Sequence, residues 1–189
     1  MIILGISLSH DAGAAVIKDG KIISAVNEER LNRIKMYWGF PKLSISEAIR
    51  LANINPSEID YIAVSNLTMT GMEEGSDPTE RMKNTYEKNN IQLGKKLMYQ
   101  FSKTNFIGSN SFAKLMLYAG ILKTKKTIRY VKDYLRSIEV KAPLVQIEHH
   151  KGHAASAFLT SGYKECMTYT SDFMGDFLCC TINVCNENG

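Results

Sequence analysis

The sequence MIILGISLSHDAGAAVIKDGKIISAVN, residues 1–27, decides the fold of this chain. It contains three short apolar runs, at residues 2–7, 14–18 and 21–27, each with the length of a strand. Asp19-Gly20, between the second and third runs, is a strong two-residue hairpin signature. Residues 1–27 therefore predict an antiparallel meander of three strands.

The elements that follow alternate between helix and strand patterns. Helical spacing over residues 44–52 predicts a helix, and Ser44 with Glu47 three residues later fits a capping box. Residues 28–35 predict a loop or short helix, and 150–160 predict a second long helix. The remaining apolar runs predict strands at residues 61–65, 144–147, 167–171 and 177–184. Strands interleaved with helices predict an α/β fold.

Length and composition exclude several classes of protein. The chain has 189 residues, of which 44% are hydrophobic and 22% are charged, so we expect a globular fold and no wholesale disorder. No window approaches the roughly 18 uncharged apolar residues of a membrane helix. The first apolar run meets Asp11 and lacks a preceding basic region, so we expect a strand there and not a signal peptide. The four cysteines form no CxxC pair, which favours buried, reduced thiols in a cytoplasmic protein.

Positive charge is concentrated in one part of the chain. The net charge is +4, but residues 81–141 carry 14 Lys or Arg against 3 Asp or Glu. Such a block is typical of a solvated helical face or of a site for an anionic partner, and both interpretations stay open. We expect three parts: the first section of an α/β lobe (1–67), a basic, mostly helical insertion (68–141) and the remainder of the lobe (142–189).

Three of the four histidines lie within EHHKGH, residues 148–153. On a helix, the spacing of His149 and His153 places both rings on one face, as two ligands of one metal ion require. His150 would point elsewhere, as a supporting or substrate contact. Asp172, after the strand at 167–171, is a candidate third ligand, and Asp176 follows in the same turn. Two imidazoles and a carboxylate suit zinc, iron(II) or manganese; the alternatives are an ordinary histidine pair and a turn-capping aspartate.

A second group of polar residues follows the first strand. The turn SHDAGAA, residues 9–15, can present backbone N–H groups to a phosphate, although it is neither a Walker A loop nor a dinucleotide fingerprint. Arg30, Arg33 and Lys35 come soon afterwards. They either clamp a phosphate or carboxylate or form a solvated charged turn.

Together these motifs resemble the N-terminal part of the ATP-dependent O-carbamoyltransferases, the group that contains nodulation and antibiotic-tailoring carbamoyltransferases. The matching stretches are GISLSHDAGAAVIKDGKIISAVNEERLNRIK followed by FP, then EHHKGHAASAFLTSGY, then TYTSDFMGD. They occur in the family's order and cover about half of the chain. The combination is far more specific than any one of its motifs.

The resemblance implies a ribonuclease-H-like, actin-like ATPase half-fold. It implies a metal at His149, His153 and Asp172, with iron(II) favoured over manganese or zinc, that contacts the phosphates of ATP. The implied reaction forms carbamoyl-adenylate from carbamoyl phosphate and ATP and passes the carbamoyl group to a substrate hydroxyl. His10 and Lys35 are then the candidate catalytic residues. The candidates for binding substrate or nucleotide are Asp11, Arg30, Arg33, His150 and Asp176.

The resemblance also implies that the chain is incomplete. Family members are much longer, so we expect a fragment that is inactive alone and that needs a C-terminal half or a partner subunit; a homodimer is a further option. Phe173 stands where the family usually has Gly, which weakens the assignment of Asp172. Two alternative functions stay open: a protein like the tRNA threonylcarbamoyl transferases, and a non-enzymatic nucleic-acid-binding module that uses the basic insertion.

Overall fold

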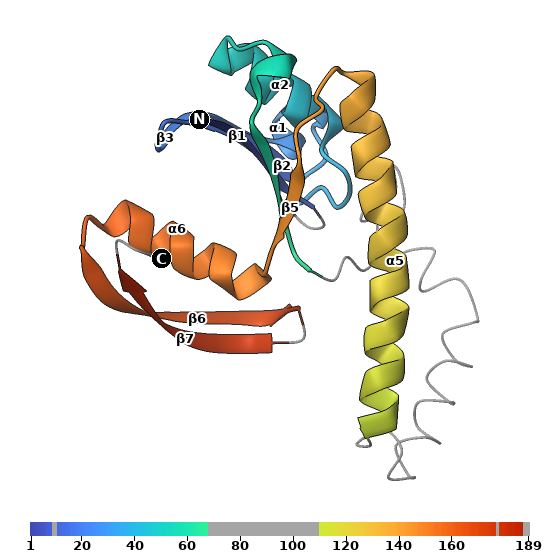
Figure 1. The fold of residues 1–189 in the computed structure, drawn as a ribbon, viewed down its shortest axis with the longest axis vertical. Coiled ribbons are helices and arrows are strands. Elements are labelled where there is room, and N and C mark those ends of the chain that lie inside the picture. The colour runs from blue at the N-terminus through green and yellow to red at the C-terminus, as the bar shows by residue number, and fades with distance from the viewer. Residues whose placement is uncertain (9–10, 68–109, 177, 187–189) are drawn as a thin grey trace.

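The computed structural model describes residues 1–8, 11–67, 110–176 and 178–186. Its centre is a five-stranded mixed sheet with the strand order β3-β2-β1-β4-β5 (Figure 1). β1 pairs antiparallel with β2 and parallel with β4, and β5 pairs parallel with β4. The strands are β1 (Ile2–Ser7), β2 (Gly13–Lys18), β3 (Lys21–Asn27), β4 (Tyr61–Ser65) and β5 (Leu144–Ile147). The predicted meander and the α/β fold class are confirmed.

The turn between β2 and β3 has the backbone conformation that its two residues favour. Asp19 and Gly20 have φ angles of 50° and 78°, so both lie in the left-handed region that a two-residue hairpin turn requires. Lys18 pairs with Lys21 across this turn. The turn therefore sets the first two pairs of the hairpin, and the register shifts between Val16 and Ile17.

The helices of the main lobe are α1 (Glu28–Asn32), α2 (Lys42–Ala52) and α5 (Asn110–Ser137), with a 3₁₀ turn, η1 (Pro56–Glu58). Alternate residues of β1, such as Leu4 and Ile6, pack in one core with Ile45 of α2 and with Val131 and Leu135 of α5. Because successive side chains of a strand point to opposite faces, α2 and α5 cover the same face of the sheet. The last turns of α5, which the sequence predicts as insertion, are thus part of the core.

The capping box predicted at Ser44 and Glu47 is wrong. Helix α2 begins two residues earlier, with Pro41 as its N-cap and no side-chain cap of its own. The buried carboxylate of Glu28 accepts hydrogen bonds from the backbone N–H groups of Leu43 and Ser44, at 3.1 and 2.7 Å. A residue from α1 therefore satisfies the free N–H groups at the start of α2.

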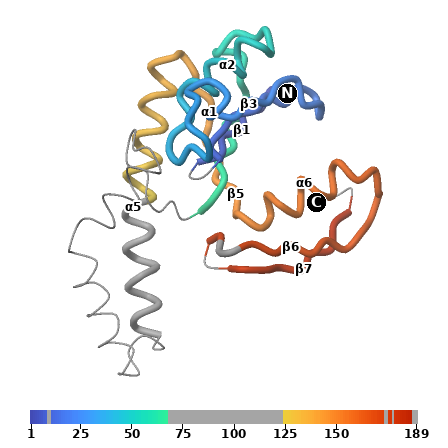
Figure 2. Tube along the Cα trace, turned by 180° about the vertical axis from the view of Figure 1, so that it is seen from behind, coloured from blue at the N-terminus to red at the C-terminus, as the bar shows by residue number. Residues whose placement is uncertain are grey.

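The C-terminal part of the described chain is a helix over a two-stranded sheet (Figure 1, Figure 2). It consists of α6 (His149–Ser161) and the antiparallel pair β6 (Glu165–Gly175) and β7 (Leu178–Asn186). Both strands are longer than the sequence predicts. All four cysteines are free, but Cys179 and Cys180 are exposed, so the expected burial of these thiols is wrong.

Some predictions fall outside the described residues. These are His10 and most of the predicted insertion (68–109). In the part of the chain that the structure describes, no helix is long and apolar enough to cross a membrane.

Candidate metal centre

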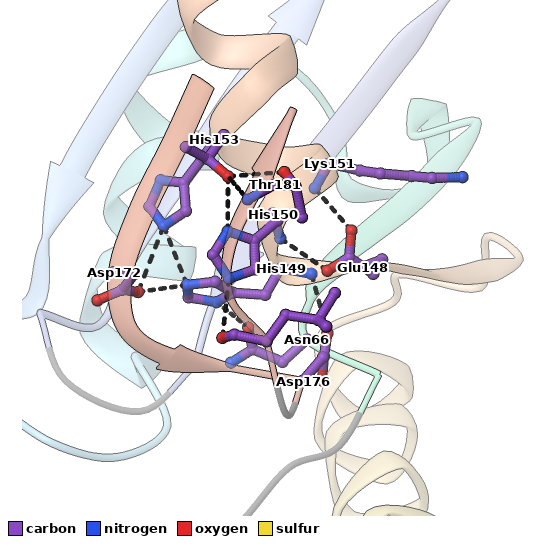
Figure 3. Close-up of polar contacts among 11 residues, drawn as sticks. Asn66, Glu148, His149, His150, Lys151, His153, Asp172, Asp176 and Thr181 are labelled. Atoms are coloured by element: carbon purple, nitrogen blue, oxygen red, sulfur yellow. Dashed lines mark hydrogen bonds and ion pairs between the residues drawn. The ribbon is translucent and has the colours of Figure 1, made fainter. Parts of the chain in front are cut away.

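One edge of the sheet gathers the ends of its three parallel strands. β1, β4 and β5 all end there, and such an edge is where open α/β sheets bind ligands. Asn66 and Leu67 follow β4, and Glu148 and α6 follow β5. The turn between β6 and β7 reaches the same place, because Asp176 bonds to the first residue of α6 (Figure 3).

His149, His153 and Asp172 converge at this edge (Figure 3). The Nε2 atom of His149 lies 2.6 Å from Oδ2 of Asp172 and 2.9 Å from Nε2 of His153. The His153 Nε2 atom lies 3.6 Å from the same carboxylate oxygen. Helix α6 supplies both histidines from successive turns, as their spacing predicts, and β6 supplies the aspartate.

The neighbour of His149 decides which of its ring nitrogens carries hydrogen. Its Nδ1 atom lies 2.6 Å from Oδ1 of Asn66, an oxygen that only accepts hydrogen bonds. With the amide in this orientation Nδ1 is the donor, and Nε2 either carries a second proton toward Asp172 or offers its lone pair to a metal ion. A carboxylate oxygen of Asp172 and the Nε2 atoms of His149 and His153 thus face one another, and a proton or metal ion is required between them.

The three side chains fit a divalent metal ion. Metal bonds to His and Asp are about 2.0–2.2 Å long, so two ligands at a right angle lie about 3 Å apart. The observed separations of 2.6, 2.9 and 3.6 Å bracket that value. Asn66 supplies the acceptor for the second ring nitrogen that a ligating histidine usually has. Zinc, iron(II) and manganese all accept this set of donors.

Two carboxylates hold the start of α6 in place. Oδ2 of Asp176 accepts from the backbone N–H of His149 at 2.8 Å and from that of Leu67 at 2.9 Å. The side chain of Glu148 accepts from His150 N at 2.9 Å and Lys151 N at 2.8 Å. The first three N–H groups of α6 are therefore bonded within the protein. In the described structure Asp176, which we expect to bind substrate or nucleotide, ties the β6–β7 turn to Leu67 after β4 and to α6.

Gly175 provides the space for the His149 ring. A Cβ atom at this position would overlap the imidazole of His149. The backbone of β6 therefore packs directly on the ring. Only glycine permits this contact without moving one of the two elements.

The surroundings of His150 fit the supporting contact, one of the two roles that the sequence leaves open for it. Its side chain is fully buried, with Nδ1 2.7 Å from Oγ1 of Thr170 and Nε2 2.9 Å from the carbonyl oxygen of Leu178. Both ring nitrogens are thus used to join α6 to β6 and β7. His150 is a structural residue of the described fold, and it has no ring atom left for a substrate.

The second group of predicted site residues lies at the same edge but on other strands. Asp11 is in the exposed β1–β2 turn, and Arg30, Arg33 and Lys35 are exposed in and after α1. Backbone bonds from Ala12 to Tyr37 and from Glu28 to Ala12 hold this turn against α1. With strands about 4.8 Å apart, the turn lies about 10 Å, and α1 about 19 Å, from the end of β5.

Three residues of the centre were not predicted from sequence. Asn66 could have been identified from the sequence, because a polar residue directly after a buried strand lies at the ligand-binding edge of the sheet. Glu148 had a weaker signal, since it precedes the helix at the capping position but is not a usual N-cap type. Gly175 had no signal, because its role depends on a ring from another element.

Comparison with known proteins gives one family. A model of the family described as "Carbamoyltransferase N-terminus" matches residues 2–189. An uncharacterised protein of Synechocystis sp. is 32% identical over 178 residues, which are 93% of this chain and 26% of that protein. The nodulation protein NolNO of Sinorhizobium fredii is 28% identical over 170 residues, 89% of this chain and 20% of that protein. The chain therefore spans well under half the length of these relatives.

Proposed function

This chain belongs to the carbamoyltransferase N-terminus family, and from that premise we propose that it forms the metal-binding lobe of a metal- and ATP-dependent carbamoyltransferase. The proposed reaction joins carbamoyl phosphate and ATP to form carbamoyl-adenylate, whose carbamoyl group then passes to a substrate hydroxyl. The observation that carries the proposal is the convergence of His149, His153 and Asp172 within 4.8 Å at the ligand-binding edge of the sheet.

The metal ion is assigned to the two histidines and the aspartate, with iron(II) preferred and manganese or zinc as alternatives. When bound, it supplies positive charge that neutralises the phosphates of a nucleotide. Asn66 keeps the His149 ring in the tautomer with a free Nε2, and Asp176 fixes the start of α6 under it. These residues preorganise the ligands, so little reorganisation is needed when the ion enters.

The polar residues on the neighbouring strands fit the other parts of the proposed reaction. The edge of the sheet that carries the metal ligands also carries, on the far side of β4, Asp11, Arg30, Arg33 and Lys35. A nucleotide whose phosphates meet the metal would extend along this edge toward them. We assign Arg30 and Arg33 to substrate or phosphate binding. His10 and Lys35 are proposed for contact with the carbamoyl intermediate or the acceptor, with His10 accepting the hydroxyl proton.

The sheet supports the finer fold proposal, a ribonuclease-H-like half of an actin-like ATPase. That half-fold opens with an antiparallel meander and continues with parallel strands on the other side of β1. The order β3-β2-β1-β4-β5, with β2 alone antiparallel to the rest, agrees with it. The length of the relatives supports the proposal that further protein completes the reaction.

Metal-dependent nucleotide binding tests the proposed function. The 189-residue chain, loaded with manganese(II) or, without oxygen, with iron(II), is titrated with a non-hydrolysable ATP analogue by calorimetry. We expect saturable binding that requires the metal and disappears in His149→Ala. Ser156→Ala, an exposed change farther along α6, serves as the control and should bind normally. Nucleotide binding that is identical with and without metal would refute the proposal.

A further inference from the structure

A solvent-open cleft of about 540 Å³ runs between α5 and the ends of β4 and β5. It lies outside the metal centre, because its lining contains none of His149, His153 and Asp172. The residues that carry the argument are Leu67, Lys125, Arg129, Lys132, Arg136 and Gln146. Four of these six are cations from one helix.

The four cations share one face of α5. They recur at intervals of four, three and four residues, which places them in a row along the helix. The neighbouring face is apolar, and its Val131 and Leu135 are buried in the core. Because that burial fixes the rotation of α5, the cations are directed along the cleft rather than spread around the helix.

Little negative charge balances this row. Asp133, also in the lining, lies 3.8 Å from Arg136. In the described part of the chain, Lys125, Arg129 and Lys132 have no carboxylate within ion-pair distance. Like charges one helical turn apart repel each other, so the row destabilises the free helix and is relieved when an anion binds.

We propose that this cleft is a binding site for a compact polyanion that carries two or more phosphate groups. The cleft volume is within the range of pockets for small molecules, about 300–1,000 Å³. Two guanidinium groups and two ammonium groups supply the forked and point-like donors that phosphate oxygens accept. This site is additional to the proposed carbamoyl transfer and does not depend on it.

The described lining favours a small polyanion over single-stranded nucleic acid. Proteins that bind single strands stack the bases on aromatic side chains, and the cleft lining contains none. The nearby tyrosines of α5 are engaged elsewhere: the rings of Tyr130 and Tyr134 pack edge-to-face on Phe40, with centroids 5.4 and 5.0 Å apart. The described lining of the cleft thus offers charge but no stacking surface.

The cleft is connected to the metal centre by hydrogen bonds. Gln146 donates to the carbonyl oxygens of Asn66 and Leu67, each at 3.2 Å. The N–H of Leu67 donates to Asp176, which also holds His149. A polyanion in the cleft therefore contacts the segment that orients the metal ligands, although it does not touch the ligands themselves.

The test uses tripolyphosphate as the probe and the metal-free 189-residue chain in low salt. Calorimetry should give saturable binding of one equivalent. Lys132→Gln should weaken it at least fivefold, whereas Lys126→Gln, which removes the same charge from the same helix outside the cleft lining, should change the affinity less than twofold. His149→Ala should bind the probe normally, so failure of the metal proposal and failure of this one are distinguishable.

Three outcomes would overturn the proposal. The first is an absence of saturable binding at low salt. The second is an equal loss in the Lys132 and Lys126 variants, which would mean only general charge attraction. The third is tighter binding of a single-stranded RNA oligomer than of tripolyphosphate, with a steep dependence on salt, which would indicate nucleic acid as the ligand class.

Discussion

Oδ1 of Asn66 lies 2.6 Å from Nδ1 of His149, and this contact directs the other ring nitrogen, Nε2, toward Asp172 and His153. The two residues are 83 positions apart in the chain. Asn66 directly follows β4, and His149 comes two residues after the end of β5. The parallel pairing of β4 and β5 brings them together. The candidate metal centre is therefore a product of the sheet topology.

Replacing Asn66 with Ala should weaken metal binding. Loss of such a partner typically lowers metal affinity about 10- to 100-fold, because the ligand ring is no longer held in one tautomer and orientation. Competition between manganese(II) and a coloured chelator measures the change. Asn55→Ala, which removes the cap of η1 far from the centre, is the matched control and should keep its affinity. An Asn66 variant with unaltered affinity would show that the contact plays no part.

Two glycine variants test the packing on His149. Gly175→Ala should displace the ring or the β6–β7 turn and abolish tight metal binding, because the added methyl group overlaps the imidazole. Gly152→Ala adds a methyl group where nothing lies within 4 Å, one turn from His149 on the same helix. It should keep metal binding and raise the free energy of unfolding by up to about 1 kcal/mol. Equal metal affinity in both variants would contradict the described packing.

Variants of His150 and His153 test whether the first residue serves stability and the second serves metal binding. His150→Ala removes a fully buried ring with two hydrogen bonds and should lower the free energy of unfolding by about 2–4 kcal/mol. His153→Ala changes a side chain that is 53% exposed, so its effect on stability in metal-free protein should be within about 0.5 kcal/mol. Urea unfolding without metal measures both. The assignment fails if His153→Ala proves the more destabilising of the two.

Ser44 and Glu28 test the corrected start of α2. The buried Ser44 hydroxyl has no hydrogen-bond partner in the described structure, so Ser44→Ala should leave stability unchanged or raise it. Glu28→Ala leaves two buried N–H groups without their charged acceptor and should cost about 2–4 kcal/mol. Denaturant unfolding curves decide between this arrangement and the capping box, for which Ser44→Ala would be the damaging change.

The fold was predictable from sequence where local sequence signals mark the two ends of an element. Asp19-Gly20 sets the first hairpin, and β1, β3, β4 and β5 have the predicted limits. The cap of α2 was not predictable, because its acceptor, Glu28, comes from another helix. The β6 and β7 strands were predicted too short, because their ends alternate with polar residues instead of forming an apolar run.

The candidate ligands were predictable from a local pattern in the sequence. The contacts around them were not predictable. The spacing of His149 and His153 places both rings on one helical face wherever that helix lies. The burial of His150 depends on Thr170 and Leu178, which belong to strands 20 and 28 residues away. No pattern within EHHKGH distinguishes a buried histidine from a ligand, and only the packing of α6 on the hairpin does so.

The most direct test of the central claim is a manganese(II) titration followed by electron paramagnetic resonance, in which bound ion loses the signal of the free ion. The 189-residue chain should bind one equivalent, and the His149→Ala and His153→Ala variants should lose that binding while Ser156→Ala retains it. Stoichiometric binding that survives both histidine changes would contradict the account, as would a wild-type chain that binds no ion.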